Sequence, residues 1–392
     1  MKVITRTIWI LSLVSLFTDT ASEMLYPIMP IYLQSIGFSV VLIGMLEGLA
    51  EATAGFSKGY FGNWSDNSGR RAPFVQMGYA LSAISKPLMA LFTAPLWIFG
   101  VRTIDRLGKG VRTAARDAIL SGESTPQNKG KIFGFHRSMD TVGAVLGPLL
   151  ALIYLQYHPQ QYKTLFLIAF APGVLAVICA MLIKDKGAKP VQRQRVSFFA
   201  FLGYRKQSPA AYRKLAGGLL VFTLFNSSDV FLLLRAKSAG LNDQSVILVY
   251  IFYNLVYALA AFPIGIIADR VGLKRTLLTG LVLFAITYFG MAIPGSRYYY
   301  FALFFTYGLY AAATEGVSKA WISNMVSNTQ VATAIGTFAA FQSICALLAS
   351  SIAGLLWYSL GPAVTFSITG VVAIAVVVYL ARLPYQTSIT VK

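Results

Sequence analysis

A short polar loop occurs twice in this chain, and the distance between its two copies constrains the fold more than any other feature. The first copy, GNWSDNSGRR, begins at Gly62, and the second, GIIADRVGLKR, begins at Gly265, 203 positions later. Asp66 and Asp269 occupy the same place in the two copies. Each copy lies between long apolar segments. Because the interval is about half the chain, the repeat predicts two similar halves.

The composition around these loops is that of an integral membrane protein. Hydrophobic residues make up 56% of the 392 residues and charged residues only 12%, whereas soluble proteins carry about 25% charged residues. The net charge of +19 would suggest a nucleic-acid partner in a soluble protein. Here the bases gather in loops on one side of the predicted spans, which is the positive-inside pattern of cytoplasmic loops. We therefore expect a lipid bilayer around the protein and no nucleic acid as its partner.

Apolar segments of about 20 residues, the length that crosses a bilayer, predict twelve spans. They run over residues 7–34, 39–62, 72–93, 96–120, 132–157, 163–183, 215–235, 245–268, 273–293, 298–325, 331–358 and 363–382. The expected domains are an N-terminal six-helix bundle (1–183), a basic cytoplasmic linker (184–214) and a C-terminal six-helix bundle (215–392). Within the linker, residues 196–204 suit a short helix on the membrane surface. The even count predicts a multi-pass protein of the cytoplasmic (inner) membrane with both termini in the cytoplasm.

Six spans, a basic linker and six more spans, with the polar loop after the second and the eighth, resemble the major facilitator superfamily. The signature loop of that family reads Gly, three residues, Asp, a base, any residue, Gly and then bases. Asn67 stands in the place of the base in the first copy, and Arg270 fills it in the second. The resemblance covers the whole chain. It implies an all-α integral membrane protein with twelve transmembrane helices in two six-helix bundles, and a transporter rather than an enzyme.

The resemblance also implies a gate at the two loops. In the family the loop is thought to hold the two halves together in the outward-facing state, with its aspartate facing the start of a helix in the other half. Arg137 and Asp140 of the fifth span are expected beside Asp66 in that gate. The gating candidates are Asp66, Arg70, Arg71, Arg112, Arg137, Asp140, Asp269 and Arg270. A plain tight turn with topogenic charges is the alternative.

Further stretches narrow the resemblance. The spacing of the superfamily's antiporter motif recurs in the fifth span at Gly134, Gly143, Gly147 and Pro148. The final glycine pair of that motif is replaced by Ala151 and Leu152, and ordinary small-residue packing explains the same pattern. Three stretches, TDTASEMLYP, DRLGKGVRTAARDA and GFHRSMD, resemble a prokaryotic group of facilitators with unassigned substrates.

Ionised side chains inside the predicted spans need an explanation, because each costs about 3 kcal/mol at mid-membrane. Asp19 with Glu23, and Glu47 with Glu51, are spaced i,i+4, so each pair shares one helix face. Adjacent carboxylates favour the uptake of a proton, which is what proton coupling requires. The first-half candidates for solute binding and proton coupling are Asp19, Glu23, Glu47, Glu51, Lys86, Arg102, Asp105, Arg106 and Lys109. Internal ion pairing is the alternative, since five acids there face five bases.

The second half is poorer in charge and richer in aromatic residues. The family arrangement, in which the first, fourth, seventh and tenth spans line a central cavity, adds four candidates there: Asp229, Arg235, Glu315 and Lys319. Aromatic side chains would supply hydrogen-bonding and stacking walls, and they are Tyr250, Tyr253, Tyr257, Phe304, Phe305, Tyr307 and Tyr310.

These features favour a secondary active transporter that works by alternating access and is coupled to protons. The chain has no GxxxxGK[ST] loop, so ATP is not expected as the energy source. We expect no cofactor, no metal site and a monomer. The bases of the first half favour a small polar or anionic solute, such as an organic acid, a phosphorylated metabolite or a metal chelate (siderophore). A proton-coupled exporter of drugs or metabolites and a non-transporting receptor or sensor are the alternatives.

Overall fold

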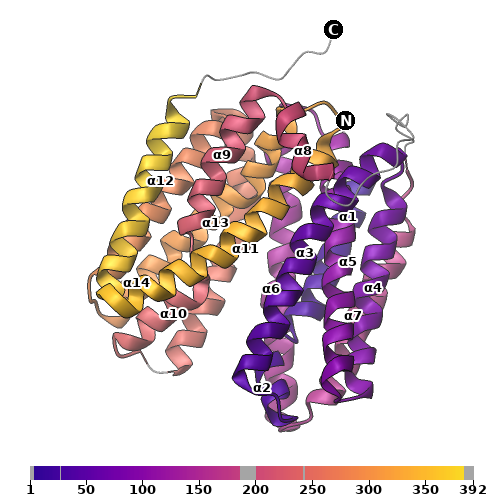
Figure 1. Ribbon diagram of the computed structural model, residues 1–392, viewed down its shortest axis with the longest axis vertical. Helices are drawn as coiled ribbons and strands as arrows, with labels where there is room; N and C mark the ends of the chain where they lie inside the picture. Colours follow the sequence, from indigo (N-terminus) through magenta and orange to yellow (C-terminus); the bar gives the residue numbers. More distant parts are fainter. Residues whose placement is uncertain (1–3, 27, 186–199, 242, 384–392) are drawn as a thin grey trace. The chain divides into compact units, whose positions relative to one another are not determined.

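The computed structural model of this protein describes an assembly of helices. The described residues are 4–26, 28–185, 200–241 and 243–383. Every regular element in them is an α-helix, which confirms the all-α prediction. The helices, labelled in Figure 1, are α1 Arg6–Glu23, α2 Met29–Ser35, α3 Val40–Ser68, α4 Ala72–Leu91, α5 Pro95–Gly122, α6 Lys129–Tyr157, α7 Tyr162–Met181, α8 Ala200–Gln207, α9 Ala210–Phe225, α10 Asp229–Ser238, α11 Asp243–Val271, α12 Leu273–Ala292, α13 Arg297–Asn324 and α14 Val331–Ala381.

The internal repeat is visible in the lengths of the helices. α3 and α11 each have 29 residues, α4 and α12 each have 20, and α5 and α13 each have 28. α3 is followed by Gly69 with a φ of 67°, and α11 is followed by Gly272 with a φ of 108°. Positive φ favours glycine because glycine has no Cβ. Each loop copy therefore ends its helix with a glycine at positive φ.

The first segment of each half is divided, although the sequence predicts one continuous span in both places. α1 ends at Glu23 and α2 begins at Met29. α9 ends at Phe225 and α10 begins at Asp229. Each of these predicted spans is therefore divided between two helices, although Ala210–Ser238 still qualifies as one candidate membrane span.

Local sequence explains the second break and suggests a cause for the first. Residues 226–228, Asn-Ser-Ser, have side chains that compete with the helical backbone for hydrogen bonds. Ser228 then caps α10, because its hydroxyl accepts a hydrogen bond from the N–H of Val230. In the first half, the sequence has Pro27 between the two helices, and proline disfavours helical geometry in the residue before it.

The helices form two compact units, and each has its own packing. Unit 1 comprises Met1–Glu123, Met139–Gln207 and Ser327–Ala340. In it α5 packs against α3 and α4, and α7 packs against α1 and α4. Gly78 and Gly108 face one another across the α4–α5 contact, and a Cβ on either would lie 2.6 Å from the carbonyl oxygen of the other. Small residues at this crossing let the two backbones approach closely.

Unit 2 comprises Ser124–Ser138, Ser208–Val326 and Phe341–Lys392. In it α13 packs against α11 and α12. The centre of this unit is aromatic: the rings of Phe284 and Tyr288 stack with their centroids 4.0 Å apart. Stacked rings add to the stability gained by burying them. The division into two six-helix bundles joined by a linker stays a prediction.

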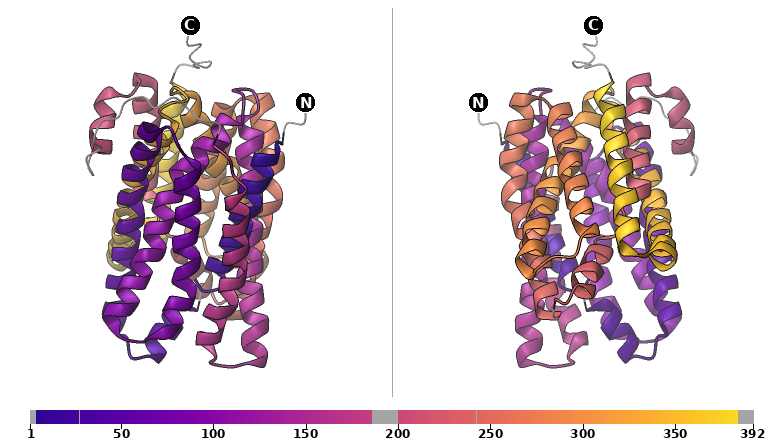
Figure 2. Two further views of the ribbon diagram at one scale, coloured as in Figure 1. Left: turned by 90° about the vertical axis from the view of Figure 1, so that its right-hand side faces the viewer. Right: turned by 90° about the vertical axis from the view of Figure 1, so that its left-hand side faces the viewer.

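α14 consists of two helices joined at a bend. Gly361 has a φ of 81° and a ψ of 168°, outside the helical region, and Pro362 follows it. Figure 2 shows the two arms of α14 turning back on each other from this bend. The bend separates the two segments that the sequence predicts as the last two spans.

α8 occupies part of the predicted linker. Residues 186–199 of that linker lie outside the described residues, and so does the first part of the surface helix expected over 196–204. α8 packs against α3. Phe201 is buried there, and its ring lies 2.7 Å from the position of a Cβ built on Gly59. The absence of a side chain on Gly59 therefore makes room for the ring.

Seven helical segments among the described residues are long and apolar enough to cross a membrane. α5 is not one of them, because charged residues are spread along it from Arg102 to Asp117. Length and composition therefore do not establish all twelve predicted spans, and the count of twelve stays a prediction.

Candidate functional site

The charged stripe predicted for α5 is buried at three of its four positions. The side chains of Arg102, Asp105 and Arg106 are 7%, 10% and 10% exposed, whereas Lys109 is exposed. Side chains three or four residues apart lie on one helix face. Since α5 packs against α3 and α4, the buried part of the stripe meets side chains of those two helices.

Asp105 is the centre of an ion-pair network in unit 1. Its Oδ1 accepts hydrogen bonds from Lys86 Nζ at 2.9 Å and from Ser85 Oγ at 3.2 Å. Its Oδ2 lies 3.6 Å from Arg102 Nη1 and 4.0 Å from Arg106 Nε. One carboxylate thus compensates three buried bases, which is how such charges are accommodated away from water.

α3 supplies two further acids to this network. Arg102 donates to Glu47 from Nη2 at 2.8 and 3.0 Å and from Nε at 3.1 Å, in the fork geometry of a strong arginine–carboxylate pair. Arg106 Nη1 lies 3.7 Å from Glu51 Oε1. The side chains of Glu47 and Glu51 remain 35% and 54% exposed, although their basic partners are buried. The network is closed around Asp105 and open at the two glutamates.

Asp19 of α1 and Asp140 of α6 lie side by side in unit 1. The two carboxyl groups are close enough to interact electrostatically, and Asp140 accepts a hydrogen bond from Ser15 Oγ. Gly143 permits this approach, because a Cβ there would lie 2.4 Å from a carbonyl oxygen of α1. Two adjacent carboxyl groups repel one another when both are ionised, and sharing one proton relieves this repulsion. The sequence pairs Asp19 with Glu23 instead, and Glu23 lies half-buried one turn further along α1.

Arg112, a predicted gate residue, is buried in the contact between α4 and α5. Its guanidinium carbon lies 4.5 Å from the centre of the Tyr79 ring, and its Nη1 donates to Ser82 Oγ. A cation over a ring face is an attractive arrangement. One turn further along α5, Arg116 forms an ion pair with Asp117 at 2.9 Å.

The first loop copy caps the start of α14 within unit 1. Asp66 Oδ2 accepts from the backbone N–H of Thr333 at 2.7 Å and from its hydroxyl at 2.9 Å. Asp66 Oδ1 accepts from Arg71 Nη2 at 2.8 Å, and the same nitrogen donates to the carbonyl oxygen of Asn328 at 2.7 Å. The first N–H groups of a helix have no partner inside the helix and attract an anion. Asp66 therefore links the end of α3 to the beginning of α14.

The second loop copy repeats this arrangement within unit 2. Asp269 Oδ1 accepts from the N–H of Gly130, and Oδ2 accepts from the N–H of Lys131, both at 2.7 Å. These N–H groups belong to the first turn of α6. Lys131 and Thr333 are 202 positions apart, so the two aspartates cap corresponding helices of the repeat.

Three further gate candidates, Arg70, Arg270 and Arg137, have different environments. Arg70 and Arg270 are exposed. Arg137 is half-buried in unit 2, with its guanidinium carbon 5.2 Å from the centre of the Tyr257 ring and its Nε donating to the Tyr257 hydroxyl. Each gate candidate belonging to a loop copy thus lies at or just beyond the end of α3 or α11.

Asp229 is held by two tyrosines in unit 2. Its Oδ2 accepts from the Tyr253 hydroxyl of α11 at 2.6 Å, and its Oδ1 accepts from the Tyr307 hydroxyl of α13 at 2.5 Å. Arg235, two turns further along α10, donates from Nε to the carbonyl oxygen of Met291 at 2.8 Å. The two charged candidates of α10 therefore have different neighbours.

Glu315 and Lys319 lie one turn apart on α13, and both are half-buried. The carbonyl oxygen of Glu315 accepts from Ser318 Oγ at 3.1 Å. α13 also carries Tyr307, so the acidic and aromatic candidates of the second half share this helix.

Sequence reasoning missed the partners that long-range packing supplies. It did not find Thr333 as the partner of Asp66, nor Asp140 as the partner of Asp19. The repeat contains a signal for the first pair, because Lys131 precedes Thr333 by nearly the same interval that separates the two loops. We see no comparable signal for the second pair, which depends on how α6 crosses α1.

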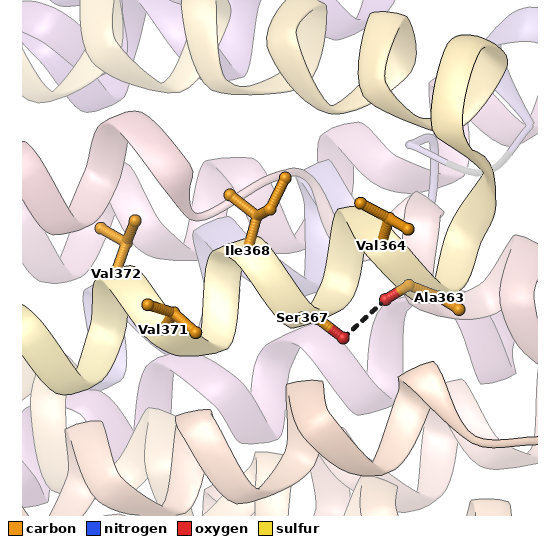
Figure 3. Close-up of a pocket in the computed structure, with 6 residues that line it drawn as sticks. All are labelled: Ala363, Val364, Ser367, Ile368, Val371 and Val372. Carbon is orange, nitrogen blue, oxygen red and sulfur yellow. Dashed lines mark hydrogen bonds between the residues drawn. The ribbon is translucent and has the colours of Figure 1, made fainter.

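A shallow apolar depression lies along the second arm of α14. It is lined by Ala363, Val364, Ser367, Ile368, Val371 and Val372 (Figure 3). Ser367 donates its hydroxyl to the carbonyl oxygen of Ala363, so its polar atom is already used. An exposed apolar helix face with no free polar group suits contact with lipid tails rather than recognition of a polar solute.

Comparison with known proteins relates the whole chain to one family of transporters. The family model of the Major Facilitator Superfamily matches residues 11–242 and 215–391. An uncharacterized MFS-type transporter of Methanocaldococcus jannaschii, MJ1317, is 33% identical over 377 residues, covering 95% of this chain and 93% of that protein.

Two other similarities are more limited. The Staphyloferrin B transporter of Staphylococcus aureus is 31% identical over 150 residues, which cover 37% of this chain and 35% of that protein. The crystal structure of the transporter FucP in the outward conformation superposes with a TM-score of 0.76 at 14% identity, covering 98% of this chain and 100% of that one. At 14% identity, the similarity to FucP shows the fold alone.

Proposed function

Since this chain belongs to the major facilitator superfamily, we propose that it is a secondary active transporter that moves a small polar or anionic solute across the cytoplasmic membrane by alternating access. The family and its fold are those of transporters, so the chain is not an enzyme. The resemblance inferred from the repeated loop is confirmed. The solute, the coupling ion and the direction of transport belong to the proposal.

One observation carries the proposal of a passage for polar solutes. Three bases of α4 and α5, Lys86, Arg102 and Arg106, are buried, while the acids Glu47 and Glu51 that face the two arginines from α3 are partly open. A charged side chain in a membrane helix does not face lipid, because the cost of exposing it there is high. The open face of these acids therefore suits a water-filled space rather than the bilayer.

Proton coupling is supported by the carboxyl pair Asp19–Asp140. Two carboxyl groups that lie close together favour sharing one proton, and separating them favours its release. The pair joins α1 to α6, so a movement of one helix against the other would change its proton affinity. The two loop caps, Asp66 on α14 and Asp269 on α6, are the proposed gates of the alternating cycle.

The proposed topology follows the sequence. It has twelve transmembrane helices in two six-helix domains, 1–183 and 215–392, with the linker and both termini in the cytoplasm, and the protein works as a monomer in the inner membrane. The partial similarity to the Staphyloferrin B transporter supports a metal chelate among the anionic solutes.

Export is the second candidate direction. The glycine spacing of the antiporter motif has a structural counterpart, because a Cβ on Gly143 would lie 2.4 Å from α1 and a Cβ on Gly147 would lie 2.6 Å from it. Close glycine contacts of this kind let α6 pack tightly against α1. A proton-coupled exporter of drugs or metabolites would use the same carboxyl pair in the opposite direction.

A flux experiment tests the proposal. Purified protein in liposomes is supplied with a mixture of small cell metabolites and chelates under an imposed pH gradient, and mass spectrometry measures which solutes concentrate on one side. We expect at least one solute to accumulate only when the gradient is present. Asp19→Asn should abolish that accumulation but leave gradient-free exchange of the same solute, because the substitution removes the proton site and not the passage.

Glu123→Gln is the matched control, since it neutralises an acid at the end of α5 outside the proposed site. This variant should retain the accumulation. Solute binding without any flux would favour the receptor or sensor, and full accumulation by Asp19→Asn would remove Asp19 from the coupling mechanism.

A further inference from the structure

The break between α9 and α10 collects hydrogen-bond acceptors inside unit 2. α9 ends at Phe225, and the last carbonyl groups of a helix have no partner within the helix. Asn226 Oδ1 is buried and has no hydrogen-bond partner among the described residues. The side-chain Nδ2 of Asn226 donates to the Tyr310 hydroxyl at 3.1 Å, so the side chain is held in place. A buried acceptor of this kind calls for a donor from a ligand or a water molecule.

Asp229 adds a negative charge three residues further on. Both of its oxygens accept from phenol hydroxyls, at 2.6 and 2.5 Å, and these donors are neutral. In the part of the chain that the structure describes, Asp229 forms no ion pair with a lysine or arginine. Arg235 of the same helix donates to a backbone carbonyl instead. A carboxylate without a cationic partner in such surroundings favours binding a cation.

Aromatic rings line the same position. The ring centroids of Tyr253 and Tyr307 are 5.4 Å apart, and those of Tyr307 and Tyr310 are 5.3 Å apart. All three tyrosines are buried. Two of them bind Asp229 and the third binds Asn226, so the polar groups of the helix break and the rings form one cluster. Ring faces attract organic cations, and their apolar surface packs against the carbon atoms next to the charge.

We propose that this cluster, Asp229 with Asn226, Tyr253, Tyr307 and Tyr310, binds the protonated amine of an organic solute. The carboxylate balances the charge, the free amide oxygen accepts an N–H, and the rings contact the carbon atoms. The inference rests on the proposed transport function, because it assigns an amine group to the transported solute. In the simpler alternative, the two hydroxyl contacts of Asp229 only fix α10 against α11 and α13.

The test uses three probes of equal size and different charge. Full-length protein in lipid nanodiscs is titrated by calorimetry with benzylammonium, benzyl alcohol and benzoate, with no ion gradient present. We expect benzylammonium to bind about tenfold or more tightly than benzyl alcohol, in line with a desolvated cation–ring contact and a charge pair. Asp229→Asn should remove this difference, and Asp229→Glu should restore part of it.

Further variants separate binding from folding. Tyr253→Leu removes a ring and should weaken benzylammonium binding more than benzyl alcohol binding. Tyr299→Phe is its matched control, because the Tyr299 hydroxyl donates to the carbonyl oxygen of Gly290 outside the cluster. Glu123→Gln is the control for loss of one acid. Both controls should keep the preference for the amine, and the melting temperature of each variant reports whether it is folded.

The outcomes decide between the two readings of the cluster. Equal affinity for benzylammonium and benzyl alcohol, or an unchanged preference in folded Asp229→Asn, would overturn the amine site. If Asp229→Asn does not fold, an unchanged preference in Tyr253→Leu would overturn it equally. Amine binding that depends on Asp229, in a protein that shows no gradient-driven flux, would support this site and refute the transport function instead.

Discussion

At the scale of single residues, the charges of unit 1 are unequal in importance. Asp105 is the shared acceptor of Lys86, Arg102 and Arg106. Lys86, by contrast, is one of three bases around it. Removing the shared acid leaves Lys86 without its ion-pair partner and takes the buried carboxylate away from two arginines, whereas removing one base leaves the acid with two others. A buried charge that loses its partner is more costly than a pair that is absent altogether.

Stability measurements on two variants test this inequality. Asp105→Asn should lower the free energy of unfolding by about 3–5 kcal/mol, the cost of leaving buried charges unpaired. Lys86→Met should lower it by roughly 1–2 kcal/mol, because Asp105 keeps its two arginines. Lys109→Met is the control at an exposed position of α5 and should change stability by less than about 0.5 kcal/mol. Denaturation in detergent micelles gives all three values, and a larger loss in Lys86→Met than in Asp105→Asn would contradict the shared-acceptor arrangement.

At the scale of helices, the sequence was most informative where a local rule applies. The loop repeat placed the ends of two corresponding helices only approximately: the predicted spans end at residues 62 and 268, whereas α3 continues to Ser68 and α11 to Val271. The glycine of each copy, which has a positive φ, marks the observed helix end more closely than the start of the polar segment does. Sequence reasoning missed the break in the first segment of each half, where hydropathy alone joins α1 to α2 and α9 to α10. The Asn-Ser-Ser of residues 226–228 is a local stop signal that an apolar average conceals.

The site was less predictable than the helices for a related reason. Charge pairs on one helix, such as Asp19 with Glu23, follow from spacing alone. The pairing of Asp19 with Asp140 joins residues far apart in the chain, and it depends on a glycine contact that no periodicity reveals. Sequence therefore identified most charged residues of the candidate site but not their partners.

The helix caps at the two loops allow a prediction at this scale. Asp66→Ala should slow solute exchange more than it weakens solute binding, because Asp66 caps α14 and lies about four turns along α3 from Glu51. Loss of such a cap costs about 0.5–2 kcal/mol, so the first turn of α14 should also exchange its amide hydrogens faster. Solute exchange across liposomes, binding titrations and amide hydrogen exchange measure the three effects. Asn67→Ala is the matched control, since the Asn67 side chain donates to Asn63 and not to α14. If the variant weakens solute binding more than it slows solute exchange, Asp66 belongs to the solute site.

At the scale of the whole molecule, the repeat extends from motif to architecture. The two loop copies end helices of equal length and cap the first turns of α14 and α6, which are themselves corresponding elements. A duplicated six-helix plan accounts for both correspondences with one rule. This plan also requires an even number of spans in each half. The N-terminus, the basic linker and the C-terminus then lie on the same face of the membrane.

Cysteine labelling tests this topology directly. In a Cys179→Ser, Cys345→Ser background, single cysteines replace charged residues of opposite predicted location: Lys163 and Arg297 outside, Lys206 and Arg382 inside. A membrane-impermeant maleimide should label the first two in intact cells and the last two only in inverted vesicles, because an even count of spans puts the linker and the C-terminus together. Fluorescence of the labelled bands measures each reaction. Labelling of Arg382→Cys from outside, with Lys206→Cys protected, would mean that the second half crosses the membrane an odd number of times and that the two halves do not share one plan.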